Sequence, residues 1–257
     1  MIDLWLRSGT AGIILIPFVL LFSIGAGIVW LTHLSPARPF FASCVGIGAP
    51  FFGSVALLFS LFAAFLANDV QHQAIQAQAA VNREADGIRT ILRLSEALGE
   101  AGSPLKTAIV GYAQSVLVTE WPAMREGRLA NENLDSLRRV IAAALAPSLA
   151  TAAGPAAHQA IVDSLVEIRQ ARRDRIASTD RQSALFNWLA TLILGVLTQI
   201  AVAVVQLDKI RPQALALFVF TTAFAATVAL IGLGERPFTG HHIDDESLRA
   251  ALASATQ

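Results

Sequence analysis

Four long apolar stretches, arranged as two pairs, dominate the pattern along the chain. The first pair covers about 11–31 and 40–67, and the second covers about 185–207 and 212–233. Each stretch reaches the length of about 20 apolar residues that a helix needs to cross the hydrocarbon core of a bilayer. A short turn containing charged residues joins the two members of each pair. The pattern therefore predicts four transmembrane helices in two hairpins.

The segment between the hairpins has the pattern of water-facing helices. From 70 to 98, apolar residues recur every three or four positions, which is typical of an amphipathic helix that continues out of the second crossing. Further helices are expected over 103–119, 133–146 and 155–176. Trp121 and Pro122 are expected to end the first of these three helices.

The predicted fold class is an all-α integral membrane protein with a helical domain between two transmembrane hairpins. The expected domains are the N-terminal hairpin 1–67, the helical domain 68–184, the C-terminal hairpin 185–233 and a tail at 234–257.

The distribution of basic residues predicts which side of the membrane the helical domain occupies. With four crossings, both termini and the helical domain share one side, and the two short turns lie on the other. Basic residues near the membrane ends favour the cytoplasmic side. The domain side carries Arg7, Arg83, Arg169, Arg172, Arg173, Arg175, Arg181, Arg236 and Arg249, and the turn side carries Arg38, Lys209 and Arg211. We therefore expect a multi-pass protein of the inner (plasma) membrane, with its domain and termini in the cytoplasm.

Composition narrows the classes of function. The chain is 54% hydrophobic and 15% charged, whereas a soluble domain carries about 25% charged residues. Its net charge is zero and its 19 basic residues form no block, which argues against a nucleic-acid partner. The single cysteine, Cys44, leaves no disulfide framework and no cysteine-based zinc site. The common motifs of nucleotide, zinc-protease and serine-hydrolase sites are missing, so we expect neither an enzyme nor a cofactor.

Several short motifs in a fixed order carry a resemblance to a known family. They are Arg83-Glu84-Ala85, a tyrosine-containing helix that ends in Glu120-Trp121-Pro122, Arg172-Arg173-Asp174-Arg175, and Pro237-Phe238-Thr239-Gly240. This order resembles the bestrophin-like family, a group of mostly bacterial membrane proteins of unknown function whose domain was once called DUF4239. The family is distantly related to bestrophins, which are pentameric anion channels with a central pore lined by the second of four crossings. The resemblance implies a homo-oligomer, with a pentamer expected, in contact with membrane lipids and small anions. The helical domain departs from bestrophins in its aromatic and acidic features.

The second apolar stretch offers candidate pore residues. Ile47, Phe51 and Val55 are spaced four apart on one face, similar to the apolar residues of the hydrophobic neck of bestrophins. Phe59 and Phe62 continue the helix and are secondary pore candidates. The alternative for the stripe is contact with lipid or a neighbouring helix. For Phe59 and Phe62, ordinary packing is the favoured alternative.

Charged residues of the helical domain offer two further candidate sites. Arg83 and Glu84 could line a cytoplasmic vestibule and bias the ion that enters it, although pairing on the helix surface or between subunits is the alternative. The cluster of Arg169, Arg172, Arg173 and Arg175 could bind anionic lipid headgroups. Its alternative is salt bridging to Glu167, Asp174 and Asp180.

The acidic run after the fourth crossing resembles a metal site only superficially. Asp244, Asp245 and Glu246 follow His241 and His242, in the place where animal bestrophins carry an acidic calcium-binding cluster. Carboxylates are also favoured at the N-terminus of a helix, because they complement its free N–H groups and its dipole. We favour that interpretation and assign no metal.

Two classes of function, and a third less favoured one, fit these features. The leading interpretation is a bestrophin-like channel for small anions, with the pore lined by the second crossing. The competing one is a non-conducting membrane scaffold or sensor whose cytoplasmic helices bind a partner protein. A transporter is disfavoured because the crossings lack the paired charges that coupled ion sites need.

Overall fold

Helices are the only regular secondary structure in the part of the chain that the computed structural model describes. That part comprises residues 5–6, 8–36, 39, 49–126, 134–180, 185–235, 238, 243–253 and 255. The expected all-α class is confirmed. The chain divides into two compact units, each described by itself below. They are Met1–Gln71 with Gln182–Glu235, and His72–Arg181 with Arg236–Gln257.

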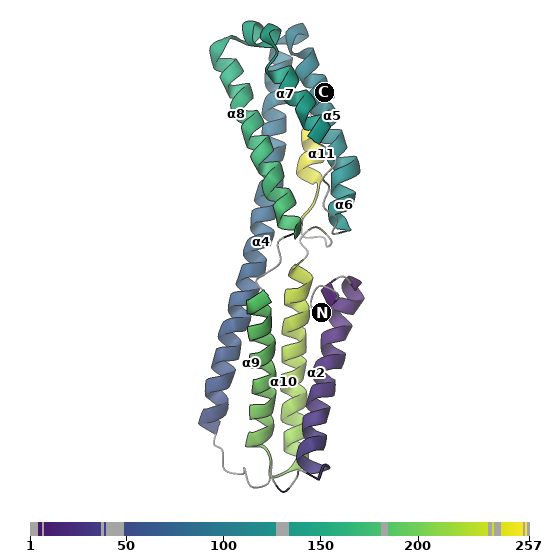
Figure 1. Ribbon diagram of the computed structural model, residues 1–257, viewed down its shortest axis with the longest axis vertical. Helices are drawn as coiled ribbons and strands as arrows, with labels where there is room; N and C mark the ends of the chain where they lie inside the picture. Colours follow the sequence, from purple (N-terminus) through teal and green to yellow (C-terminus); the bar gives the residue numbers. More distant parts are fainter. Residues whose placement is uncertain are drawn as a thin grey trace. The chain divides into compact units, whose positions relative to one another are not determined.

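The first unit is a bundle of long apolar helices (Figure 1). It contains α2 (Gly9–His33), the first part of α4 (Ala49–Ala97), α9 (Leu185–Val205) and α10 (Ile210–Gly234). These four helices are long and apolar enough to cross a membrane. The bounds of α2, α9 and α10 lie close to the expected ones. Helix α4 continues from the second apolar stretch into the amphipathic one without a break, as the helical spacing of both stretches predicts.

A polar contact ties three helices together inside this apolar bundle. Gln199 on α9 is fully buried, and its Nε2 donates to the hydroxyl of Thr221 on α10 at 2.8 Å. The same Nε2 donates to the carbonyl oxygen of Leu21 on α2 at 3.3 Å. Apolar surface gains little from leaving lipid, so close packing and interhelical hydrogen bonds hold membrane helices together. Gly195 provides the close packing, because it leaves room for the ring of Phe224.

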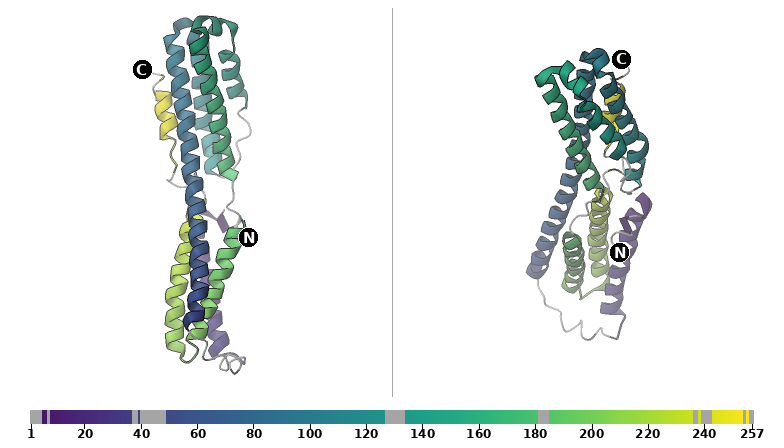
Figure 2. Two further views of the ribbon diagram at one scale, coloured as in Figure 1. Left: turned by 90° about the vertical axis from the view of Figure 1, so that its left-hand side faces the viewer. Right: turned by 45° about the horizontal axis from the view of Figure 1, so that its top comes forward.

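The second unit packs its amphipathic helices around one apolar core (Figure 2). The later part of α4 contributes fully buried residues such as Ala85, Ile88 and Ile91. The other helices are η1 (Gly99–Gly102), α5 (Ser103–Ser115), η2 (Val116–Glu120), α6 (Trp121–Arg125), α7 (Leu134–Ala144), α8 (Pro147–Asp180) and α11 (Glu246–Ala253). Asp135–Ala144 and Pro147–Ser178 together are also long and apolar enough to cross a membrane, although the pair is bent by 72°.

One helix boundary in this unit differs from the expected one, and another coincides with a kink. Trp121 and Pro122 do not end the preceding helix, because the chain passes through the π-helix η2 directly into α6. Pro122 is tolerated because it lies in the first turn of α6, where a backbone N–H has no carbonyl partner within that helix. Helix α8 spans Pro147–Asp180, but Gly154 interrupts it with a φ of 71° that is readily adopted only by glycine. The part after this kink starts at Pro155, as the sequence predicts, and the helical turns from Pro147 to the kink were not expected.

The C-terminal segment belongs to the second unit, whereas the sequence suggested a separate tail. On α11, Leu248 and Ala251 are fully buried in the core of this unit. Arg89 on α4 donates from Nη2 to the carbonyl oxygen of Ser247 at 3.0 Å. The small apolar face of α11 is too short to predict this docking from its spacing alone.

The glycine at the α9–α10 contact gives a first testable prediction. A Cβ at Gly195 would lie 2.0 Å from Cζ of Phe224, so Gly195→Ala forces the ring or the helix to move. We expect a loss of about 1–3 kcal/mol, as for other overpacked sites, seen as a lower midpoint of thermal unfolding in detergent. The control is Gly111→Ala on α5, where an added Cβ meets no atom within 4 Å. Equal effects of the two variants would contradict the packing described for Gly195.

Candidate functional site

The membrane segment of α4 has one face inside the first unit and one face exposed. Phe59 lies inside, in edge contact with Phe224 at 5.1 Å and with Phe220 at 5.8 Å between ring centroids. The opposite face carries exposed apolar residues, among them Leu57 at 71% exposure and Leu61. A helix that presents such a face is suited to contact with lipid, with another subunit or with a pore.

The structure describes the side chains of three of the five pore candidates, Val55, Phe59 and Phe62. Ile47 and the side chain of Phe51 lie outside the described residues. Val55 is half-buried, and Phe62, seven positions further on, is half-buried with its ring 6.4 Å from that of Phe65. Phe59 is half-buried and packs against the apolar core of the first unit, as in the packing alternative favoured for it in the sequence analysis. Its large ring makes more contact among aromatic neighbours than it would at a free surface.

A buried cluster of charged and polar side chains joins α4 to three other helices of the second unit. Its members are Glu84 on α4, Tyr112 on α5, Glu120 on η2, and Arg172 and Arg175 on α8. Glu84, Tyr112, Glu120 and Arg175 are fully buried, and Arg172 is 6% exposed. The cluster therefore lies among the apolar side chains of the core and away from solvent.

Arg175 is the centre of this cluster. Its Nε donates to Oε2 of Glu84 at 2.6 Å, and its Nη2 donates to Oε2 of Glu120 at 2.7 Å and to Oε1 of Glu84 at 3.1 Å. Arg172 donates from Nη2 to Oε1 of Glu120 at 2.9 Å, and the hydroxyl of Tyr112 donates to Oε1 of Glu84 at 2.5 Å. Every carboxylate oxygen of the two glutamates thus accepts a hydrogen bond. Two glutamates balance two arginines, so the cluster has no net charge.

The π-helix η2 contributes one of the two carboxylates. In a π-helix the backbone bonds reach five residues back, so the helix gains a residue locally and the following side chains turn to a new direction. Glu120 is the last residue of η2 and is fully buried, whereas Val118 two positions earlier is exposed. The local distortion is therefore associated with a carboxylate that faces inward beside Arg172 and Arg175.

Burial and pairing shift the pKa values of this cluster in defined directions. Burial raises the pKa of Tyr112 well above its usual value, and the neighbouring Glu84 raises it further, so the phenol remains protonated and acts as a donor. Burial alone would lower the pKa of Arg175, but Glu84 and Glu120 outweigh it and raise the pKa. Arg175 therefore stays charged beside its two carboxylates, while the Tyr112 phenol stays neutral.

Comparison with known proteins identifies the family. A family model described as the Bestrophin-like domain matches residues 19–243. The chain belongs to the bestrophin-like family. Crystal structures of three mutant forms of a bacterial bestrophin homologue from Klebsiella pneumoniae have a similar fold. Two of them have TM-scores of 0.68, with 12% and 13% sequence identity, and alignments that cover 95% and 96% of this chain and 98% and 96% of theirs. The search of curated proteins found no match.

Glu84, Arg172 and Arg175 of this bestrophin-like chain do not occupy the surface positions expected for them. Their charged groups are buried with each other and with Glu120, so Glu84 does not line a vestibule and these two arginines are not free for lipid headgroups. The physical reason is that a buried guanidinium needs a carboxylate beside it. Arg172 and Arg175 do form salt bridges, which was the alternative to lipid binding. Their partners are Glu84 and Glu120, however, and not the expected neighbours in sequence.

The other charged candidates remain at the surface. Arg83 donates from Nη2 to Oδ2 of Asp174 at 3.0 Å, and both side chains are nearly half exposed. With Gln73 and Gln76, this pair lines a polar hollow of about 270 Å³. Arg169 and Arg173 are exposed on α8. These positions are compatible with the roles expected for them, which stay predictions.

The acidic run near the C-terminus begins a helix in this bestrophin-like chain. Helix α11 starts at Glu246, and Asp245 pairs with Arg249 at 2.7 Å one turn further on. A hydrogen bond from Arg249 lowers the pKa of Asp245. His241 and His242 lie outside the described residues. Within the described ranges, no three histidine, cysteine or acidic side chains are grouped so that they could hold a metal ion.

Two residues of the buried cluster, Glu120 and Tyr112, were assigned no role in the sequence analysis. Both occur in the motifs that resemble the bestrophin-like family, the tyrosine-containing helix and Glu120-Trp121-Pro122. An acidic residue between Thr119 and Trp121 in an otherwise apolar helix is the signal that could have suggested burial with an arginine.

The neighbours Arg83 and Glu84 provide a second prediction with a built-in control. Glu84→Gln leaves Arg175 with less compensating charge in a buried site, so we expect a loss of about 3–5 kcal/mol, the range for breaking a buried pair. Arg83→Gln removes only a surface pair with Asp174, for which we expect less than about 1 kcal/mol. Thermal unfolding of the purified protein measures both. Similar shifts for the two variants would show that the cluster does not stabilise the fold.

Proposed function

We propose that the chain forms a homo-oligomeric, pentameric channel that conducts small anions through a pore lined by the membrane segment of α4. Family membership is the observation that carries this proposal, because the matched range 19–243 includes most of α2, the other three apolar helices and the domain between them. Bestrophins, to which this family is distantly related, build their pore from the second of four crossings, and α4 is the second apolar helix here.

The faces of α4 support the same proposal. One face packs into the subunit through Phe59, Leu66 and Val70, while apolar residues elsewhere on the helix stay exposed. The stripe Ile47, Phe51 and Val55 is offset from Phe59 around the helix, because a residue four positions on turns by roughly 40°. Gly27 and Gly53 have open space next to them, which allows close approach of another subunit.

A neck of apolar side chains would act by excluding water. Ions entering such a constriction lose hydration and gain no ligand in return, so the barrier falls when the side chains are shortened. The hollow between Arg83 on α4 and Asp174 on α8 supports a vestibule role for Arg83. Arg169 and Arg173, exposed on α8, are proposed to meet anionic headgroups.

The neck provides the third prediction. In planar bilayers, Phe51→Ala and Ile47→Ala are expected to raise chloride conductance, because each widens the apolar constriction. The matched control is Leu15→Ala on α2, which is exposed and lies outside the helix proposed to line the pore, so it should leave conductance unchanged. Mass measurement in mild detergent accompanies the recordings. An assembled ring that carries no current in any variant, with any tested ion or voltage, would favour the membrane scaffold instead.

The basic residues also predict orientation, with the helical domain and both termini in the cytoplasm of a bacterial cell and the chain in the inner membrane. Protease added to inside-out vesicles should cleave near Gly154, where α8 is kinked and the neighbouring Pro155 is exposed. Right-side-out vesicles should protect the same bond. Cleavage from the periplasmic side alone would reverse the orientation.

A further inference from the structure

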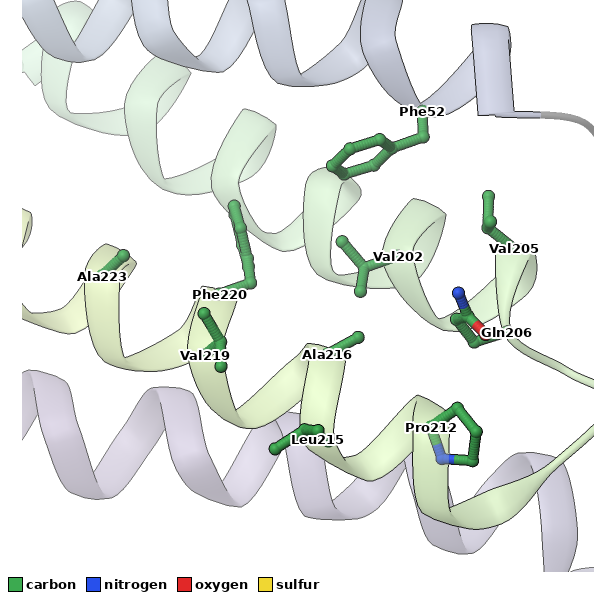
Figure 3. A pocket seen from close by; sticks show the side chains of 10 residues that line it. All are labelled: Phe52, Val202, Val205, Gln206, Pro212, Leu215, Ala216, Val219, Phe220 and Ala223. Atoms are coloured by element: carbon green, nitrogen blue, oxygen red, sulfur yellow. The ribbon is translucent and has the colours of Figure 1, made fainter.

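An apolar groove runs along the first unit between α9, α10 and the start of α4 (Figure 3). Its volume is about 620 Å³. Ten side chains line it, and all except Gln206 are apolar. Phe52 from α4 stands opposite Val202 and Phe220, as the close-up shows. The groove lies in helices that are apolar enough to cross a membrane, so its surroundings are hydrocarbon rather than water.

The length of the groove matches one leaflet of a bilayer. Its wall on α10 extends from Pro212 to Ala223, which is about 16 Å at the rise of an α-helix. Half of a typical hydrocarbon core is about 15 Å. An extended acyl chain that enters at Pro212 would therefore reach the end of the groove near the middle of the membrane.

Basic residues lie at the outer end of the groove. Gln206 and Pro212, which line that end, flank the turn between α9 and α10. The turn contains exposed Asp208 and Lys209, and exposed Arg211 lies in the first turn of α10. The outer end of the groove therefore has two positive charges and one negative charge nearby. Basic side chains at the membrane surface attract anionic lipids. The groove is therefore apolar, is about as long as an acyl chain within one leaflet, and has a net positive charge at its outer end.

We propose that this groove binds one acyl chain of an anionic phospholipid, whose phosphate lies against Lys209 and Arg211. A zwitterionic lipid has the same chains but no net charge to complement the entrance, so it binds more weakly. The proposal does not depend on ion conduction, because Phe52 rather than the stripe Ile47, Phe51 and Val55 lines the groove on α4.

Native mass spectrometry of the intact protein in mild detergent tests the proposal. The probes are dioleoyl phosphatidylglycerol and dioleoyl phosphatidylcholine, which have identical chains. We expect preferential retention of phosphatidylglycerol, and about 30-fold weaker binding of it in the variant with both Lys209→Gln and Arg211→Gln. Ala216→Trp fills the groove and should reduce binding of both lipids. Ala223→Phe fills its inner end from an exposed position, and serves if Ala216→Trp fails to fold.

Matched variants separate the groove from general effects. Leu197→Trp places a tryptophan at an exposed site on α9 outside the groove, and Arg93→Gln with Arg139→Gln removes two exposed charges from the second unit. Both should bind lipid like the wild type. Equal retention of the two lipids, or phosphatidylglycerol binding that survives both groove-filling variants, would overturn the proposal. So would groove-filling variants that abolish assembly while each monomer keeps its lipid, since a second copy would then occupy the groove.

Discussion

Arg175 carries a positive charge in a place that water does not reach. A buried guanidinium is tolerated only when carboxylates compensate the lost hydration, and both Glu84 and Glu120 do so here. This requirement fixes α4, η2 and α8 against one another, because each contributes a charge that would be costly alone. It also explains the hydrogen bond from Tyr112, which places α5 in the same arrangement by donating to Glu84.

The apolar core and the buried charges stabilise the second unit in different ways. Residues such as Ile88, Ile109 and Ile161 supply the hydrophobic free energy, which tolerates small shifts of one helix along another. The ion pairs are sensitive to such shifts, since a displacement of one turn would separate donors from acceptors. They therefore specify one arrangement among the several that the apolar residues would permit. The exposed ion pair between Arg83 on α4 and Asp174 on α8 contributes little to specifying this arrangement.

Helical spacing predicted most of the elements because it depends on neighbours in the sequence. The apolar stretches and the amphipathic run after 70 predicted helices with nearly the observed bounds, and the order of the motifs on them carried the resemblance to the family. The buried cluster could not be predicted in the same way. Arg175 and Glu84 are 91 residues apart, and the π-helix that precedes Trp121 has no known spacing rule that identifies it from sequence. The charged motifs were visible, but only the tertiary structure shows which of them are inside.

Gln199 has a consequence for how the protein enters a membrane. Its amide donates to Thr221, only 22 residues further along the chain and within the same helical hairpin. A ribosome that has released α9 and α10 has therefore already supplied a partner for the amide nitrogen of Gln199, a glutamine buried between these two helices. The hairpin can pass into lipid with that nitrogen hydrogen-bonded, before it meets α2, and the contact of the same nitrogen with Leu21 then forms as a later step of assembly within the bilayer.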